Sequence, residues 1–210
     1  DLTLRSLGPT QIKELRMVIT STQSIKCEFV SAIQADAPWK QLSSRTIDLP
    51  QPVELETLVL FAHNNESVPL LFPVGVTSAG EVWINLDVVQ TFGVEAECED
   101  MDKVWTGLVQ SLSLSPFAHD VSVVGESSNV LPGRRLVIAR DRPEELTKAL
   151  TNEESAAVLL LDGVPELREC PALYRGPIKE GKNGLRFDDG SWILCPSGIS
   201  VTPVGCTADE

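Results

Sequence analysis

Hydrophobic residues in the middle of this chain form short continuous runs that are separated by polar segments. The runs at residues 88–94, 121–125 and 156–162 have the length of buried strands. Between the first two runs, residues 101–114 place apolar side chains at the spacing of a helix. This order predicts a strand, a helix and a second strand, which is the βαβ unit that opens a nucleotide-binding sheet.

The helix predicted at residues 101–114 has the clearest pattern in the chain. Its apolar side chains recur at helical spacing along one face, at Met101, Val104, Trp105, Leu108 and Leu112. Its first turn is acidic, and carboxylates there complement the positive end of the helix dipole and can cap free amides. We therefore expect the helix to lay its apolar face on a sheet and to cap its own start.

The residues before this unit predict a mixture of helix, strand and hairpin. Residues 7–19 have helical spacing, and residues 24–33 alternate as in a strand. Residues 53–62 fit both a helix and a buried strand. Two extended segments, 70–76 and 81–86, flank a short loop that ends in glycine, which is a hairpin signal. This hairpin would deliver the chain into the central unit.

The overall order of elements predicts an α/β fold. A strand at residues 135–139 and a short helix at residues 143–150 continue the alternation, and Gly- and Pro-rich extended pieces follow. We expect a mainly parallel sheet with helices on its faces, joined by right-handed crossovers. The predicted parts are an α+β lead-in at 1–66, an α/β core at 67–165 and a tail of short antiparallel strands at 166–210 that completes the same domain.

Composition and charge narrow the classes of function. The 210 residues carry a net charge of −13, whereas a grip on a phosphate backbone needs clustered Lys and Arg. We therefore expect no direct binding of nucleic acid. No apolar run reaches the roughly 18 residues of a membrane-spanning helix, so we expect a cytoplasmic chain without membrane contact, which a segment outside it could still tether. The five cysteines are odd in number and widely spaced, which predicts reduced thiols.

The turn before the predicted helix carries the candidate chemistry. A phosphate-binding loop uses glycines, a Lys, and a Ser or Thr for magnesium. Residues 94–105 contain no glycine and no Lys-Ser or Lys-Thr pair, and like charges about 4 Å apart repel by about 1 kcal/mol even in water. We therefore predict a structural turn with no catalytic residue. Its carboxylates are instead candidates for contact with a partner: Glu95, Glu97, Glu99, Asp100 and Asp102.

Two residues keep a nucleotide-binding alternative open. Asp162 ends a hydrophobic strand, as does the Asp that holds magnesium in ATPases with such a sheet, and Lys103 follows the acidic turn. Gly163 stands where a catalytic Glu would follow. A roomy cleft lined by Arg134, Arg135 or Lys103 would favour an enzyme or switch with a non-standard phosphate site. An acidic turn on the surface near Asp162 would favour an inactive site.

Several segments together resemble a known family. They are the hairpin segments 71–76 and 82–87, the stretch from Val94 to Trp105, and residues 115–125, 159–162 and 192–203. In this order they resemble the cytoplasmic domain that precedes the transcriptional-activator domain in large actinobacterial membrane proteins of the LysM and bacterial-transcriptional-activator type. The resemblance covers about residues 68–204.

This resemblance implies a sheet like that of P-loop ATPases with an additional strand, in which the phosphate loop is degenerate. It implies a non-catalytic module of a membrane-tethered regulator. No catalytic residue of that family carries over, because residues 97–103 depart from an active loop.

The sequence therefore predicts an ATPase-like scaffold or protein-interaction module within a larger regulatory protein. Its partner would be another protein or a neighbouring domain of the same chain, and we expect no metal and no cofactor. The alternative is a nucleotide-binding enzyme or switch that uses Lys103 and Asp162 in an unconventional way.

Overall fold

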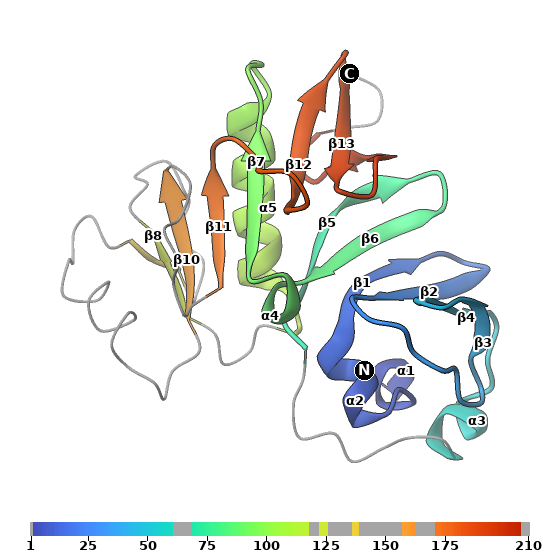
Figure 1. Ribbon diagram of the computed structural model, residues 1–210. Coiled ribbons are helices and arrows are strands. Elements are labelled where there is room, and N and C mark those ends of the chain that lie inside the picture. Colours follow the sequence, from blue (N-terminus) through green and yellow to red (C-terminus); the bar gives the residue numbers. More distant parts are fainter. Residues whose placement is uncertain are drawn as a thin grey trace.

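Two β-sheets and one long helix organise the chain (Figure 1). The computed structural model describes residues 2–60, 69–117, 122–125, 136–138, 157–162 and 171–206. In these residues the helices are α1 (Leu2–Arg5), α2 (Pro9–Glu14), α3 (Leu55–Leu60), α4 (Leu86–Val89) and α5 (Met101–Leu114). None of the helices in the described ranges is long and apolar enough to cross a lipid bilayer.

The first sheet has seven strands in the order β15-β5-β6-β1-β2-β4-β3, and each neighbouring pair is antiparallel. Its strands are β1 (Leu15–Thr20), β2 (Ser24–Phe29), β3 (Lys40–Ser43), β4 (Thr46–Pro50), β5 (Leu71–Thr77), β6 (Gly80–Asn85) and β15 (Thr202–Pro203). The sheet thus combines strands from the beginning, the middle and the end of the chain.

The second sheet has eight strands in the order β14-β13-β12-β7-β11-β10-β8-β9. From β12 to β9 all neighbours are parallel, whereas β13 and β14 add antiparallel pairs at one side. Its strands are β7 (Thr91–Glu95), β8 (Ser122–Gly125), β9 (Leu136–Ile138), β10 (Ala157–Asp162), β11 (Ala172–Arg175), β12 (Asn183–Asp188), β13 (Ser191–Cys195) and β14 (Ile199–Ser200).

Helix α5 and one face of each sheet share a hydrophobic core. Trp105 and Leu108 of α5 are buried there together with Phe72 of β5 and Phe92 of β7. The two phenylalanine rings meet edge to face, with centroids 5.8 Å apart and an interplanar angle of 86°, a favoured aromatic geometry. A separate core on the other face of the first sheet packs against α1 and α2.

The predicted fold class, a mainly parallel P-loop-ATPase-like sheet flanked by helices, is wrong. About half of the strands in the described residues belong to a sheet that is entirely antiparallel, and the second sheet contains both parallel and antiparallel pairs. The strands of the expected βαβ unit, β7 and β8, are parallel but not adjacent, because β11 and β10 lie between them in the sheet. Local runs of apolar residues identified strands, but the partner of each strand is set by contacts between distant segments, which periodicity does not reveal.

The predicted helix at residues 7–19 is also wrong in its second half. Helix α2 ends at Glu14, and residues 15–20 form β1, which pairs with both β2 and β6. The apolar positions of this segment satisfy both a helical and a strand period. Pairing on both edges satisfies the strand backbone and decides the outcome. The ambiguous segment at residues 53–62 forms a helix over Leu55–Leu60.

Several local predictions are confirmed, among them the strands expected at residues 121–125, 135–139 and 156–162, which form β8, β9 and β10. The hairpin forms as β5 and β6 around residues 77–80, and α5 spans the predicted residues with Val104, Trp105, Leu108 and Leu112 buried. The predicted strand at residues 88–94 begins later than expected, because Leu86–Val89 forms the short helix α4. The helix expected at residues 143–150 lies outside the described residues. The predicted domain boundaries stay a prediction.

Candidate functional site

The acidic turn lies at the carboxyl edge of the parallel strands in the second sheet. The register aligns Asp162 of β10 with Arg175 of β11, and Arg175 with Val94 of β7. It also aligns Glu95 of β7 with Arg186 of β12. Carboxyl edges of parallel strands are where open α/β sheets bind ligands, so this edge is the first candidate for a functional surface.

The Glu95 carboxylate forms hydrogen bonds with other residues of the chain. Its Oε2 accepts hydrogen bonds from the Arg186 Nε at 2.9 Å and from the Ile178 backbone N–H at 2.8 Å. The carboxylate raises the pKa of the Arg186 guanidinium through the hydrogen bond and its charge. Arg186 also donates to the Ile178 carbonyl oxygen at 2.8 Å. Glu95 therefore fastens the loop after β11 to β12, and we assign it to structure.

Asp102 and Asp100 are also paired within the chain. The Asp102 Oδ1 lies 2.7 Å from the Arg175 Nη1, and the Arg175 guanidinium carbon lies 5.0 Å from the centre of the Trp105 ring. The Asp100 Oδ1 lies 3.1 Å from the Lys103 ammonium. Asp100 is the N-cap of α5 but makes no side-chain cap hydrogen bond, so the expectation that this carboxylate caps the helix is wrong.

Glu97 and Glu99 differ from the other three acids of the turn. Both are exposed, and within the described part of the chain no ion pair or hydrogen bond engages either carboxylate. They are the members of the predicted set whose charge is left for solvent or a partner.

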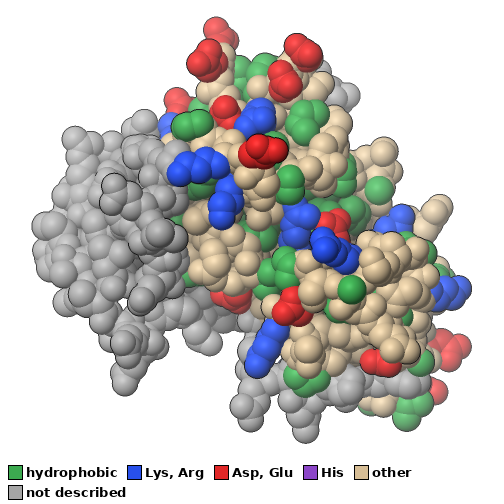
Figure 2. Space-filling model, in the orientation of Figure 1, with side chains coloured by type: hydrophobic (Ala, Val, Ile, Leu, Met, Phe, Trp, Pro, Cys, Tyr) green, Lys and Arg blue, Asp and Glu red, His purple; other side chains and the backbone are tan. Residues whose placement is uncertain are grey.

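A second pair of exposed acids lies at the same edge. The hairpin between β12 and β13 turns at Asp189 and Gly190, both with positive φ (46° and 77°), as the tight two-residue hairpin turn requires. Arg186 aligns with Glu95 at the last printed pair of the β12–β7 ladder, and Asp188 and Glu97 each follow that pair by two residues. In Figure 2, several Asp and Glu side chains, coloured red, lie at the top of the molecule. We call Glu97, Glu99, Asp188 and Asp189 the acidic edge.

The structure describes two of the residues named for the nucleotide alternative, Lys103 and Asp162. Asp162 ends β10 at the same edge as the turn, and Lys103 contacts Asp100 within the first turn of α5. Arg134 and Arg135 lie outside the described residues. The choice between an inactive site and a phosphate site therefore stays a prediction.

Sequence reasoning missed the cations that pair with this turn. Arg175 and Arg186 come from strands more than seventy residues further along the chain than Asp102 and Glu95. The available signal was their place near the ends of short strands, but their partners depend on the strand order. The pairing of β12 with β7, which brings Asp188 to the edge that carries the acidic turn, was likewise not predicted.

Tyr174 and Cys195 lie near Glu95, and the pKa of each side chain is raised. Burial raises the pKa of the Tyr174 hydroxyl, and the Glu95 carboxylate adds to this. Burial likewise raises the pKa of the Cys195 thiol, against the opposing effect of Arg186. Because the thiolate is the reactive form of cysteine, a raised pKa argues against a nucleophilic role for Cys195.

The cysteines of the described residues form no disulfide. Cys27, Cys98, Cys195 and Cys206 are free thiols, and Cys170 lies outside the described ranges. Within those ranges no group of three or more His, Cys, Asp and Glu side chains could hold a metal ion.

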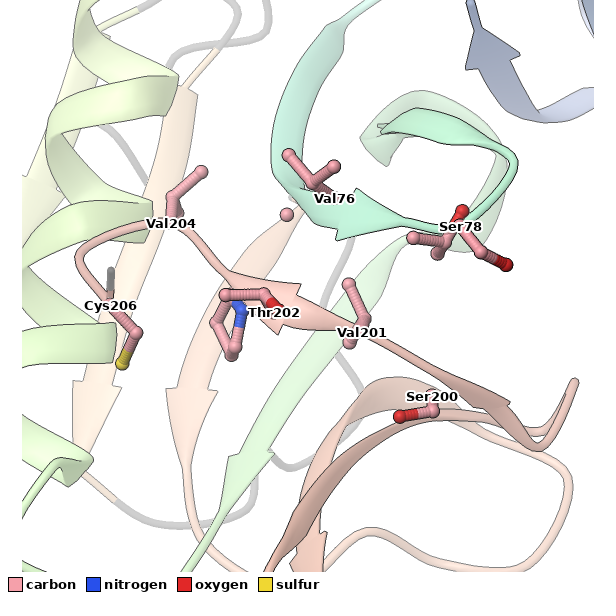
Figure 3. Close-up of a pocket in the computed structure, with 10 residues that line it drawn as sticks. Val76, Ser78, Ser200, Val201, Thr202, Val204 and Cys206 are labelled. Carbon is pink, nitrogen blue, oxygen red and sulfur yellow. The ribbon is translucent and has the colours of Figure 1, made fainter. Parts of the chain in front are cut away.

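An open groove of about 610 Å³ lies between the end of β5 and the tail of the chain (Figure 3). It runs along Ser200 to Val204, which leave the second sheet at β14 and join the first at β15. Cys206 closes it on the side of α5. The described lining has hydroxyl and small aliphatic side chains besides this thiol. Such a groove suits an uncharged ligand and supplies no acid–base pair.

Comparison with known proteins gives no relative from which a function could be proposed. No protein-family model and no curated protein matches the sequence.

Proposed function

We propose that this chain is a non-catalytic protein-interaction module whose acidic edge binds a basic segment of a partner protein or of a neighbouring domain. The observation that carries the proposal is that some acids at this edge form ion pairs within the chain and others do not. Glu95, Asp100 and Asp102 are engaged by cations of the same chain, whereas Glu97 and Glu99 are exposed and make no such contact in the described residues.

The charge of the whole chain supports a basic partner. At a net charge of −13, the chain attracts cations over a distance and accelerates their encounter at low salt. The acidic edge places part of this charge on the loop after β7 and on the β12–β13 hairpin, and β7 and β12 pair in one sheet. Lysine and arginine side chains are the complementary groups in a protein partner.

The test measures binding of a labelled peptide of alternating lysine and alanine by fluorescence anisotropy at low salt. The variant Glu97→Gln/Glu99→Gln should weaken binding by about fivefold, since each exposed ion pair contributes about 0.5 kcal/mol. The matched control Asp36→Asn/Glu56→Gln removes the same charge from exposed positions away from this edge and should weaken binding by less than about twofold.

Equal weakening by the two variants would contradict the proposal, because it would show attraction to the net charge without a defined surface. Saturable heat on titration with ATP and magnesium would favour the nucleotide-binding alternative instead. The calorimetric experiment is independent of the peptide and therefore separates the two functions.

We also propose that the chain acts in the cytoplasm as part of a larger regulatory protein, as the family resemblance implies. Protease digestion of intact and lysed cells that make the natural protein tests this location. We expect an antibody against this chain to detect protection in intact cells and digestion after lysis. Digestion in intact cells would contradict a cytoplasmic location.

A further inference from the structure

A smaller pocket, of about 190 Å³, lies on the face of the first sheet that points away from α5. Val18 of β1 and Trp83 of β6 are cross-strand neighbours and form its floor. Alternation along β6 puts Trp83 on the opposite face from Val82 and Ile84, which belong to the core with α5. The pocket is therefore separate from the acidic edge.

Two aromatic rings set the shape of this pocket. Trp83 and Phe117 meet at an angle of 87° with their centroids 5.9 Å apart, so their surfaces form a corner. Leu4 of α1 and Leu71 of β5 add aliphatic walls. Among the described residues that line it, no side chain is charged. An apolar cavity of about 150 Å³ is large enough to bind benzene, so this pocket fits one side chain and is too small for a nucleotide.

A carboxylate stands at the rim of the pocket. Thr20 lines the pocket and is the cross-strand neighbour of Glu81. The Glu81 Oε2 accepts a hydrogen bond from the Trp83 indole Nε1 at 3.0 Å. This bond fixes the carboxylate at the edge of the indole ring, next to an apolar space that carries no charge of its own.

We propose that this pocket binds the side chain of a lysine or arginine residue of a partner protein. Such a side chain joins an aliphatic stem to a cationic head, and the stem packs on apolar surface while the head stays at a polar rim. Here Leu4, Val18 and Leu71 would take the stem. The faces of aromatic rings attract cations, and the Glu81 carboxylate complements the charge of the head.

A neutral apolar side chain would pack on the walls but would gain nothing from the charge of the Glu81 carboxylate at the rim. The net charge of −13 also favours arrival of a cation over that of an acid. The proposal goes beyond the acidic edge, since it names a separate site that recognises a single basic side chain by shape as well as by charge.

The test titrates the ¹⁵N-labelled chain with n-butylammonium and, separately, with n-butanol. The readout is the indole N–H resonance of Trp83, which is one of four tryptophans and can be assigned with the variant Trp83→Phe. We expect a saturable shift and an affinity for the ammonium about fivefold higher than for the alcohol, since a cation near an aromatic face gains about 1 kcal/mol.

Glu81→Gln should lower the preference for the cation, because Gln keeps an acceptor for the Trp83 N–H but carries no charge, whereas the aromatic faces remain. The control Glu180→Gln, at an exposed position in the loop between β11 and β12, should keep the preference for the cation. Equal affinity for butylammonium and butanol in the unmodified chain would overturn the proposal and leave an apolar pocket. Absence of a saturable shift with butylammonium would also overturn it.

Discussion

The guanidinium of Arg175 lies over the ring of Trp105 at 5.0 Å and contacts the Asp102 carboxylate at 2.7 Å. The side chain therefore joins the end of β11 to the first turns of α5. Trp105 supplies the buried end of this connection, with an exposed fraction of 1%, and Asp102 the solvent end. We therefore expect the contact with Trp105 to contribute more to stability than the ion pair with Asp102.

Replacement of Trp105 by Ala should lower the free energy of unfolding by about 3–5 kcal/mol, because it empties a large site in the core between the sheets. Urea denaturation measures the change. Leu114→Ala is the control on the same helix, since Leu114 is 78% exposed, and it should have little effect. A near-neutral change for Trp105→Ala would refute the central placement of α5.

Arg175→Met should cost about 1–2 kcal/mol, because it removes the cation from the indole face in a partly desolvated position. Asp102→Asn should cost less than about 0.5 kcal/mol, since an ion pair to an exposed carboxylate contributes little. Urea denaturation of the two variants measures the difference. Equal losses would show that the ion pair, and not the aromatic contact, dominates.

Gly107→Ala should destabilise the chain although it lies within a helix. Alanine normally favours a helix over glycine by about 1 kcal/mol, but a Cβ at Gly107 would lie 2.5 Å from the Val204 carbonyl oxygen. We expect a net loss of about 1–3 kcal/mol in thermal or urea unfolding. Gln110→Ala, on the same helix, is the control, and a stabilising Gly107→Ala would disprove the close packing of the tail on α5.

Asp87 should make stability depend on pH. Burial raises the pKa of its carboxyl above the ordinary 3.8, and the hydrogen bond from the Leu70 N–H opposes this only in part. The folded state thus keeps a proton that the unfolded state has lost, so stability falls as the pH rises from about 3.8 through the raised pKa. Asp87→Asn keeps an acceptor for Leu70 but cannot ionise.

The measurement is urea denaturation of both proteins over a series of pH values from acid to neutral. The variant should gain stability relative to the parent chain as the pH rises through this window. A constant difference between the two proteins across the series would show that Asp87 titrates alike in the folded and unfolded states.

Local patterns in the sequence were sufficient where the structure depends on neighbours along the chain. The helix at Met101–Leu114 needs only an apolar stripe, and the β5–β6 hairpin needs only two strands and a turn with a terminal glycine. The acidic turn was likewise visible from residues 95–102, because nothing but its composition was required.

Tertiary structure decided the rest. The sequence could not show that residues 15–20 pair on both edges and form a strand, nor that two distant arginines neutralise Glu95 and Asp102. It also could not show that Glu81 stands beside Trp83 at an apolar pocket. The sequence alone determined which residues are apolar, acidic or able to turn. Strand order and register then decided which of them meet, because those depend on burial shared between segments far apart in the chain.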